Sequence, residues 1–176
     1  PMVKEGRRII REGLLGNIRK VVVEYAQGWL TDPIEKDGQK QAEWRVNPET
    51  SGNSLCLGDI GSHAENLLSY MTDLEITEIF GELTTFVPGR KLDDDAMAMI
   101  RFSNGAKAVL WASQIMPGEL NNLRIRIYGE KASLSWEQEN PERLTLSQKD
   151  GRKEILSRGI GGLSPIVGKT SYLPAG

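Results

Sequence analysis

One stretch of the sequence, residues 58–71, places an acid and an imidazole at helical spacing. Asp59 and His63 lie four residues apart, so a helix would project both side chains from one face, about one turn from each other. His63 is the single histidine of the chain. A carboxylate beside an imidazole is a plausible proton-transfer pair, because imidazole gains and loses protons near neutral pH. The spacing therefore indicates general acid–base chemistry at this point.

A structural role for the same two residues is the alternative. An aspartate in the first turn of a helix is often an N-cap that accepts hydrogen bonds from free backbone N–H groups. The polar stripe continues with Asn66 and Tyr70, which we expect to extend the polar pocket, Asn66 as a substrate-binding residue. A separate apolar stripe at helical spacing is expected to face the core and comprises Ile60, Ala64, Leu67, Leu68 and Met71.

Composition and charge exclude several classes of protein. The chain has 176 residues, of which 39% are hydrophobic and 26% are charged, as in a typical globular domain. Its formal net charge of −2 offers no basic surface for nucleic acid or for an anionic membrane. No apolar run is long enough to cross a bilayer, and we expect no signal peptide. We therefore expect a cytoplasmic protein without a membrane or nucleic-acid partner.

The single cysteine, Cys56, rules out an internal disulfide and fits a reducing compartment. It lies between Leu55 and Leu57, and we interpret it as a small core residue rather than a nucleophile. One cysteine and one histidine argue against a zinc site. The run Asp93-Asp94-Asp95 predicts no metal site either, because alternate side chains of a strand point apart. We expect it to form an exposed turn and the start of a strand.

The first half of the sequence predicts two helices, separated by a strand and a long loop. Residues 3–13 have the apolar spacing of a helix, and residues 18–25 are rich in β-branched side chains. Residues 31–57 show little periodicity and many turn signals, so we expect an irregular loop that leads into the helix of residues 58–71. Long loops in compact domains often carry function. We interpret Glu35-Lys36-Asp37 within this loop as solvated charge.

The second half predicts strands joined by hairpins. Turn sequences at Asn104-Gly105, Gly129-Glu130-Lys131 and Asp150-Gly151 each separate two strand-like segments. Successive hairpins build a largely antiparallel sheet, so we expect an α+β domain over residues 1–157, with a large open sheet and helices on one face. An irregular tail is expected over residues 158–176. The expected strands are residues 74–87, 96–102, 106–114, 123–128, 132–136, 144–148 and 153–156.

Such a sheet leaves one face uncovered. We expect this open face to bind a second copy of the chain and so to form a homo-oligomer. A solvated face is the alternative. Arg124 and Arg126 favour it locally, because they alternate with apolar residues along one predicted strand.

Several short segments of the chain follow one another in a recognisable order. They are Gly13–Val21, Gly28-Trp29-Leu30, Trp44-Arg45, Asn47-Pro48, Ser51-Gly52, Gly58–His63 and Leu67–Thr72. In this order they resemble the C-terminal domain of the Gfo/Idh/MocA family of NAD(P)-dependent oxidoreductases. The segment Gly58–His63 is similar to that family's Asp-x-Gly-x-His motif, and the whole ordered set is more specific than the motif alone.

The resemblance implies that the chain is the C-terminal part of a dehydrogenase and is inactive alone. NAD or NADP would be bound mainly by an N-terminal Rossmann domain, and this chain indeed lacks both Gly-x-Gly-x-x-Gly and the family's Glu-Lys-Pro motif. Carried over to this sequence, His63 would take the proton of a substrate hydroxyl while hydride leaves the same carbon. Asp59 would orient the substrate or the imidazole. The implied small-molecule substrate is a sugar, a cyclitol or a similar polyol.

Four further residues are candidates for binding. Tyr25 and Trp29 end the first predicted strand and are expected to bind substrate, because aromatic rings pack on the C–H faces of sugars. The resemblance places Trp44 and Arg45 near the cofactor or the substrate. Core packing of the aromatic rings is the alternative for these residues. The alternative for the whole chain is a non-catalytic ligand-binding or assembly module on the same scaffold.

Overall fold

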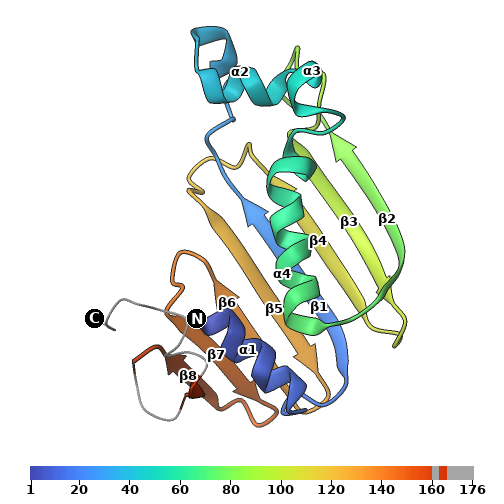
Figure 1. Cartoon of the computed structure of the whole chain (residues 1–176), viewed down its shortest axis with the longest axis vertical. Helices are drawn as coiled ribbons and strands as arrows, with labels where there is room; N and C mark the ends of the chain where they lie inside the picture. Colours follow the sequence, from blue (N-terminus) through green and yellow to red (C-terminus); the bar gives the residue numbers. More distant parts are fainter. Residues whose placement is uncertain (160–162, 166–176) are drawn as a thin grey trace.

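The computed structural model describes residues 1–159 and 163–165, which form an eight-stranded sheet with helices on one face (Figure 1). The strand order is β2-β3-β4-β1-β5-β6-β7-β8. All neighbouring strands are antiparallel except β1 and β4, which run parallel near the middle of the sheet. The predicted α+β class, with its large and mostly antiparallel open sheet, is confirmed. The tail predicted from residue 158 lies largely outside the described residues.

The elements begin and end close to the predicted bounds. The strands are β1 (Ile18–Ala26), β2 (Ile76–Thr84), β3 (Asp95–Phe102), β4 (Lys107–Ser113), β5 (Asn122–Gly129), β6 (Ala132–Glu137), β7 (Arg143–Gln148) and β8 (Lys153–Ser157). The helices are α1 (Met2–Arg11), η1 (Ile34–Asp37), α2 (Lys40–Val46), α3 (Pro48–Ser51), η2 (Leu57–Gly61) and α4 (Ser62–Thr72). Each predicted hairpin turn joins two antiparallel neighbours, namely β3 to β4, β5 to β6 and β7 to β8.

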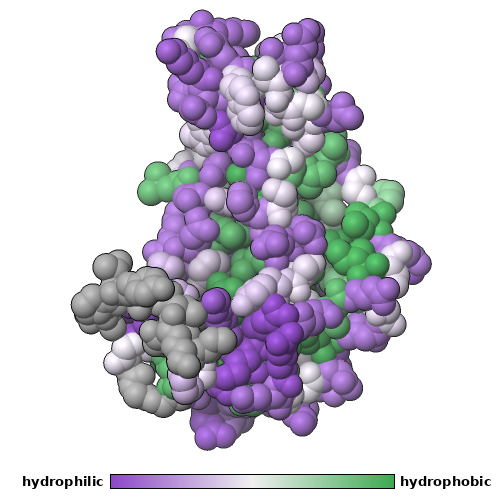
Figure 2. All heavy atoms as spheres, in the orientation of Figure 1, coloured by the Kyte–Doolittle hydropathy of each residue, from purple (hydrophilic) through white to green (hydrophobic). Residues whose placement is uncertain are grey.

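The main core lies between the sheet and the two long helices. α4 packs on β1, β4 and β5, while α1 packs on β6, β7 and α4. The predicted apolar stripe of residues 60–71 is buried, together with the alternate residues of the strands beneath it. Fully burying one such aliphatic side chain stabilises the fold by about 1.5–3 kcal/mol. Figure 2 shows hydrophobic surface in the region of the edge strand β2, beside the hydrophilic surface of α1.

The segment predicted as an irregular loop is instead folded into short helices, so this prediction is wrong. η1, α2 and α3 lie in it and form a small layer at one end of the sheet (Figure 1). α2 begins where the side chain of Gln39 caps the N–H of Ala42, at 2.8 Å. These helices have seven residues or fewer, which is too short to show a period of 3.6. Their own small core comprises Leu30, Ala42, Leu55 and Leu92.

The predicted exposed turn at residues 93–95 is also wrong, because Asp93 and Asp94 are buried. Asp93 accepts hydrogen bonds from the backbone N–H groups of Leu55 (2.9 Å) and Leu57 (2.8 Å). Asp94 accepts from the N–H groups of residues 86 and 87, at 2.8 and 2.9 Å. Backbone donors without partners are costly when buried, and these carboxylates supply the acceptors. Asp93 therefore fixes the segment that leads into η2, and Asp94 fixes the segment that follows β2.

Glu35 is likewise not solvated. Its carboxylate accepts hydrogen bonds from Nε and Nη2 of Arg90, both at 3.1 Å. Burial alone would raise the pKa of Glu35, but the hydrogen bonds and the positive charge of Arg90 hold this pKa below its ordinary value. The ion pair joins η1 to the segment that leads into β3.

Candidate active site at the carboxyl ends of β1 and β4

A pocket opens at the end of the sheet where the parallel strands β1 and β4 both finish. Parallel neighbours bring their carboxyl ends to the same edge, so the residues that follow them, Gln27 and Gln114, meet there. The short helices and the start of α4 close around this edge (Figure 1). The residues lining the pocket are Tyr25, Gln27, Trp29, Gln39, Gln41, Arg45, Asp59, Ile60 and His63.

A turn of π-helix, η2, immediately precedes α4 and carries Asp59. Single π-turns add a residue to the helical repeat and are frequent at functional sites. Asp59 lies inside this turn, and its own N–H donates to the carbonyl of Leu55 at 2.9 Å. Asp59 is therefore not an N-cap, and its carboxylate is available to other side chains.

Both hydrogen bonds to the Asp59 side chain go to one oxygen, Oδ2. Arg45 donates from Nε and Gln114 donates from Nε2, each at 2.9 Å. The Asp59 side chain is 28% exposed, so this ion pair is only partly shielded from water. Arg45 balances the charge of the Asp59 carboxylate, and the hydrogen bonds from Arg45 and Gln114 together fix the orientation of this carboxylate.

His63 projects from the first turn of α4 into the same pocket and is exposed. Within the described part of the chain its imidazole makes no hydrogen bond, to Asp59 or to any other residue. Its ring contacts Tyr25 edge-on, with the ring centres 6.3 Å apart. Both ring nitrogens therefore remain available to a ligand. The structure places Asp59 and His63 in one pocket, as predicted, but does not bond them to each other.

Arg45 lies between two tryptophans. Its guanidinium carbon is 5.6 Å from the centre of the Trp29 ring and 5.1 Å from that of the Trp44 ring. Nη1 also donates to Oε1 of Gln41, at 2.7 Å. The charge of Arg45 is thus already shared by Asp59 and two aromatic faces. Trp44 is 51% exposed beside the pocket, so it is not packed under the loop.

Tyr25 and Trp29 join the pocket through a chain of side-chain hydrogen bonds. The hydroxyl of Tyr25 donates to Oδ1 of Asn121, which also accepts from Nε2 of Gln27 at 2.9 Å. Oε1 of Gln27 in turn accepts from Nε1 of Trp29, at 3.0 Å. Tyr25 is largely buried and Trp29 is half-buried, so Trp29 presents more of its ring to the pocket.

Two residues of the predicted polar stripe lie elsewhere. Asn66 is exposed and does not line the pocket. Tyr70 packs under the guanidinium of Arg7 from α1, 4.3 Å from its ring centre, and lines a different hollow. His63, Asn66 and Tyr70 all belong to α4, so Asn66 and Tyr70 lie farther along the helix axis, at about 1.5 Å per residue, from the pocket at its first turn.

Sequence reasoning missed the amides of the site. Gln39 and Gln41 lie at the start of α2, whereas Gln27 and Gln114 directly follow β1 and β4. A polar residue just after a buried strand is a usable signal, but only when the parallel pairing of the two strands is known. That pairing joins segments 87 residues apart, and no local pattern predicts it.

The remaining candidates for chemistry are structural. Cys56 is buried, and burial raises the pKa of its thiol far above the ordinary value, so it is a core residue as predicted. Among residues 1–159 and 163–165, no group of three or more His, Cys, Asp and Glu side chains is placed to hold a metal ion. The same residues contain no helix with both the length and the apolar character to cross a membrane.

Comparison with known proteins agrees with this fold. Residues 3–135 match the model of the GFO/IDH/MocA C-terminal domain. The chain is 33% identical, over 99% of its length, to an uncharacterized oxidoreductase, YfiI, of Bacillus subtilis (strain 168), and covers 45% of that protein. The chain therefore belongs to the Gfo/Idh/MocA family of oxidoreductases, and it corresponds to their C-terminal domain.

Solved structures show the same arrangement. An inositol dehydrogenase homolog from Azotobacter vinelandii, complexed with NAD+, superposes with a TM-score of 0.94 at 32% identity, over 99% of this chain and 45% of that one. Levoglucosan dehydrogenase in complex with NADH and levoglucosan superposes with a TM-score of 0.77 at 27% identity, over 88% of this chain and 43% of that one. The chain thus spans less than half the length of these relatives, which are dehydrogenases or their homologues.

Proposed function

We propose that this chain supplies the substrate-binding and proton-transferring domain of an NAD(P)-dependent dehydrogenase that acts on a secondary alcohol of a sugar, cyclitol or similar polyol. The observation that carries the proposal is the imidazole of His63, which lies in a pocket shared with Asp59 and makes no hydrogen bond to any residue that the structure describes. An imidazole with free nitrogens can accept the proton of a bound hydroxyl group. The amide-rich lining then supplies the binding of the substrate.

The lining favours a neutral substrate with several hydroxyl groups. Gln27, Gln39 and Gln41 present amides, which both donate and accept hydrogen bonds, as hydroxyl groups do. The two charges at the wall, Asp59 and Arg45, are paired with each other, so neither offers an unbalanced charge to an ionic substrate. Trp29 adds a half-buried aromatic face on which the C–H face of a sugar ring could pack. Asn66 is not part of this proposal because it lies outside the pocket.

Within the proposed reaction the residues of this chain have separate tasks. His63 accepts the hydroxyl proton during oxidation and returns it during reduction. The carboxylate of Asp59, in the same pocket, stabilises the imidazolium that forms. Arg45 and Gln114 hold that carboxylate in place. Tyr25 limits the rotation of the imidazole through its edge-on ring contact.

A nicotinamide cofactor, when bound, provides the hydride acceptor or donor for such a reaction. Trp44 fits a position beside it, because about half of this residue is exposed next to the pocket. Arg45 fits a phosphate-binding role less well, since Asp59 and Gln41 already accept from its Nε and Nη1. We therefore assign recognition of the cofactor phosphates to a second domain, as the family resemblance implies. We also propose a cytoplasmic location for the enzyme.

The test is His63→Ala in the complete enzyme, assayed with cyclitols, levoglucosan and simple sugars against NAD and NADP. Loss of a general acid–base catalyst should lower kcat by roughly 10²–10⁴-fold with little change in Tm. Gln148→Ala, an exposed glutamine on β7, serves as the control. Undiminished turnover in His63→Ala would remove the imidazole from the mechanism and would favour a non-catalytic binding domain.

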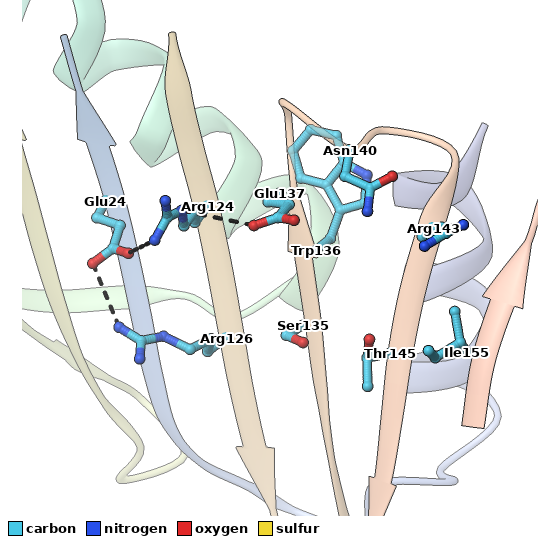
Figure 3. Close-up of a pocket in the computed structure, with 10 residues that line it drawn as sticks. All are labelled: Glu24, Arg124, Arg126, Ser135, Trp136, Glu137, Asn140, Arg143, Thr145 and Ile155. Carbon is cyan, nitrogen blue, oxygen red and sulfur yellow. Dashed lines mark hydrogen bonds and ion pairs between the residues drawn. The ribbon is translucent and has the colours of Figure 1, made fainter. Parts of the chain in front are cut away.

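We further propose that the open face of the sheet binds a second copy of the chain. Phe80, Met97 and Met99 form an apolar patch on β2 and β3, with exposed fractions of 71%, 55% and 56%. Beside it, Glu24 of β1 lies between two arginines of β5, at 3.9 Å from Arg124 and 3.4 Å from Arg126 (Figure 3). A face that carries both apolar surface and charges of both signs is suited to bind its own copy about a two-fold axis.

Light scattering at increasing concentration tests this second proposal, with Met99→Lys as the disrupting variant. A lysine in the apolar patch should shift the oligomer toward monomer, because burial of an unpaired charge opposes association. Lys153→Met, an exposed position on β8, is the control. A strict monomer at high concentration for the unmodified chain would contradict the proposal.

A further inference from the structure

We propose that Gln114 is a positioning residue for the reaction, acting through Asp59. The inference rests on the proposed function, because it assigns the orientation of the carboxylate that serves His63. Gln114 lies directly after β4 and has no exposed surface. It therefore cannot bind substrate in the observed conformation, and its effect must pass through the groups that it contacts.

The side-chain amide of Gln114 connects the two sides of the pocket. Nε2 donates to Oδ2 of Asp59 at 2.9 Å and to Oε1 of Gln27 at 3.4 Å. Gln27 also accepts from Trp29, so one buried amide joins the acid to the aromatic wall of the pocket. The contact with Asp59 also assigns the amide's orientation, because only the nitrogen can donate to a carboxylate.

The other atom of this amide is buried without a partner among the described residues. Oε1 of Gln114 has neither solvent exposure nor a hydrogen bond. Leaving a buried carbonyl unsatisfied costs stability, and an aliphatic side chain of the same size would avoid that cost. A glutamine at this position is therefore poorly explained by stability alone. Its donation to Asp59 is the interaction that an aliphatic residue would lose.

The backbone of Gln114 is held by two hydrogen bonds, so its side chain can fix the orientation of the Asp59 carboxylate. Its N–H donates to the carbonyl of Asp94, and its carbonyl accepts from the N–H of Leu30, both at 3.0 Å. Arg45 approaches the same Asp59 oxygen from the helical layer on a longer side chain. Arg45 supplies the charge that balances the Asp59 carboxylate, whereas Gln114 is neutral and contributes only to the orientation of that carboxylate. Together they leave Oδ1 without a hydrogen bond from any described residue, so this oxygen is available to a ligand.

A double-mutant cycle in the complete enzyme tests the inference. Gln114→Met keeps the length of the side chain and removes the donor. We expect kcat to fall about tenfold or more, as for loss of a hydrogen bond to a charged group, while KM changes less than threefold. In an Asp59→Asn background the same substitution should change kcat less than threefold, because its target is already altered. Gln148→Met is the matched control and should leave both constants unchanged.

Thermal denaturation separates positioning from folding. If Gln114 had only a structural role, Gln114→Met would lower Tm and kcat by the same amounts with and without Asp59→Asn. Equal losses of kcat in these two backgrounds would overturn the inference. If Gln114→Met does not fold, Gln114→Glu is the second variant. Gln114→Glu places a second carboxylate against that of Asp59, so this variant should lower Tm. Adding Asp59→Asn replaces one of the two carboxylates by an amide that can donate to the other, so Tm of the double variant should recover. Absence of that recovery would show that the two side chains do not interact.

The outcomes also separate this inference from the proposed function. If Asp59→Asn leaves turnover unchanged, the proposed catalytic pocket fails, whatever Gln114 does. If Asp59→Asn lowers turnover but Gln114→Met does not, the pocket is retained and the positioning role alone is overturned.

Discussion

Replacing Arg90 by methionine should detach the helical layer that carries half of the pocket. The Arg90 side chain is 1% exposed and donates to the carbonyls of Leu30 (2.8 Å) and Asp32 (3.0 Å). It also pairs with Asp94, which is fully buried, and with Glu35. One guanidinium thus joins the segment after β1, η1 and the start of β3.

The magnitude follows from what the substitution would leave behind. Methionine fills most of the space of Arg90 but leaves Asp94 as a buried carboxylate without a cation, and the carbonyl of Leu30 loses the donor from Arg90. The carbonyl of Asp32 still accepts from the N–H of Ile34. Removing one partner of a buried ion pair typically costs about 3–5 kcal/mol. For a domain of this size, each kcal/mol corresponds to roughly 2–4 °C in Tm. We therefore expect Arg90→Met to lower Tm by roughly 6–20 °C.

Calorimetry or circular dichroism measures the effect, with Arg101→Met as the matched control. Arg101 forms an exposed pair with Glu78, at 3.4 Å, and exposed pairs contribute at most about 1 kcal/mol. In the complete enzyme Arg90→Met should also raise KM, because Arg45 and Trp29 lie on the detached layer. If Arg90→Met and Arg101→Met lower Tm equally, the buried ion pair does not hold this layer.

Three further predictions concern residues that do not line the pocket. The thiol of Cys56 should react with a thiol reagent more than 100-fold more slowly in the folded protein than in urea, because it is buried and its pKa is raised. Burial, together with the neighbouring aspartates, raises the pKa of Asp95, so its ionisation opposes folding. Asp95→Asn should therefore raise Tm at pH 7, and this gain should vanish near pH ~3, where the carboxyl is protonated in both states. Gly28→Ala should lower Tm by several degrees, because its Cβ would lie 2.4 Å from the carbonyl oxygen of Met116, whereas Gly58→Ala meets only ordinary contacts and should not.

Local sequence signals predicted the sheet well because its strands pair mainly with their neighbours in the chain. Asn104-Gly105 and the other turn sequences predicted each hairpin, and alternation along β5 predicted which residues face the core. The helical layer was missed because its elements are short, and because buried ion pairs attach it together with a core of only four buried apolar residues. Asp94 and Arg90 illustrate this, since charged residues in a loop-like sequence are ordinarily exposed.

The candidate site was predictable only in part, for a related reason. Asp59 and His63 are close in sequence and share one helix, so their spacing was informative. Gln114 reaches Asp59 across 55 residues, through the packing of η2 on β4. The π-turn that carries Asp59 was likewise not predicted. Single-sequence periodicity contains neither the strand order nor a local change of helical repeat.

The parallel pairing of β1 with β4 also has a consequence for the order of folding. The hairpins at the far side of the sheet close short loops, whereas joining β1 to β4 closes a segment of some eighty residues. Closing a longer segment costs more entropy and slows the step that requires it. We expect the hairpins of β5 to β8 to form early and the pocket to be completed last. A partly folded chain would then contain most of the sheet and no binding site, so recovery of ligand binding should lag behind recovery of β-structure during refolding.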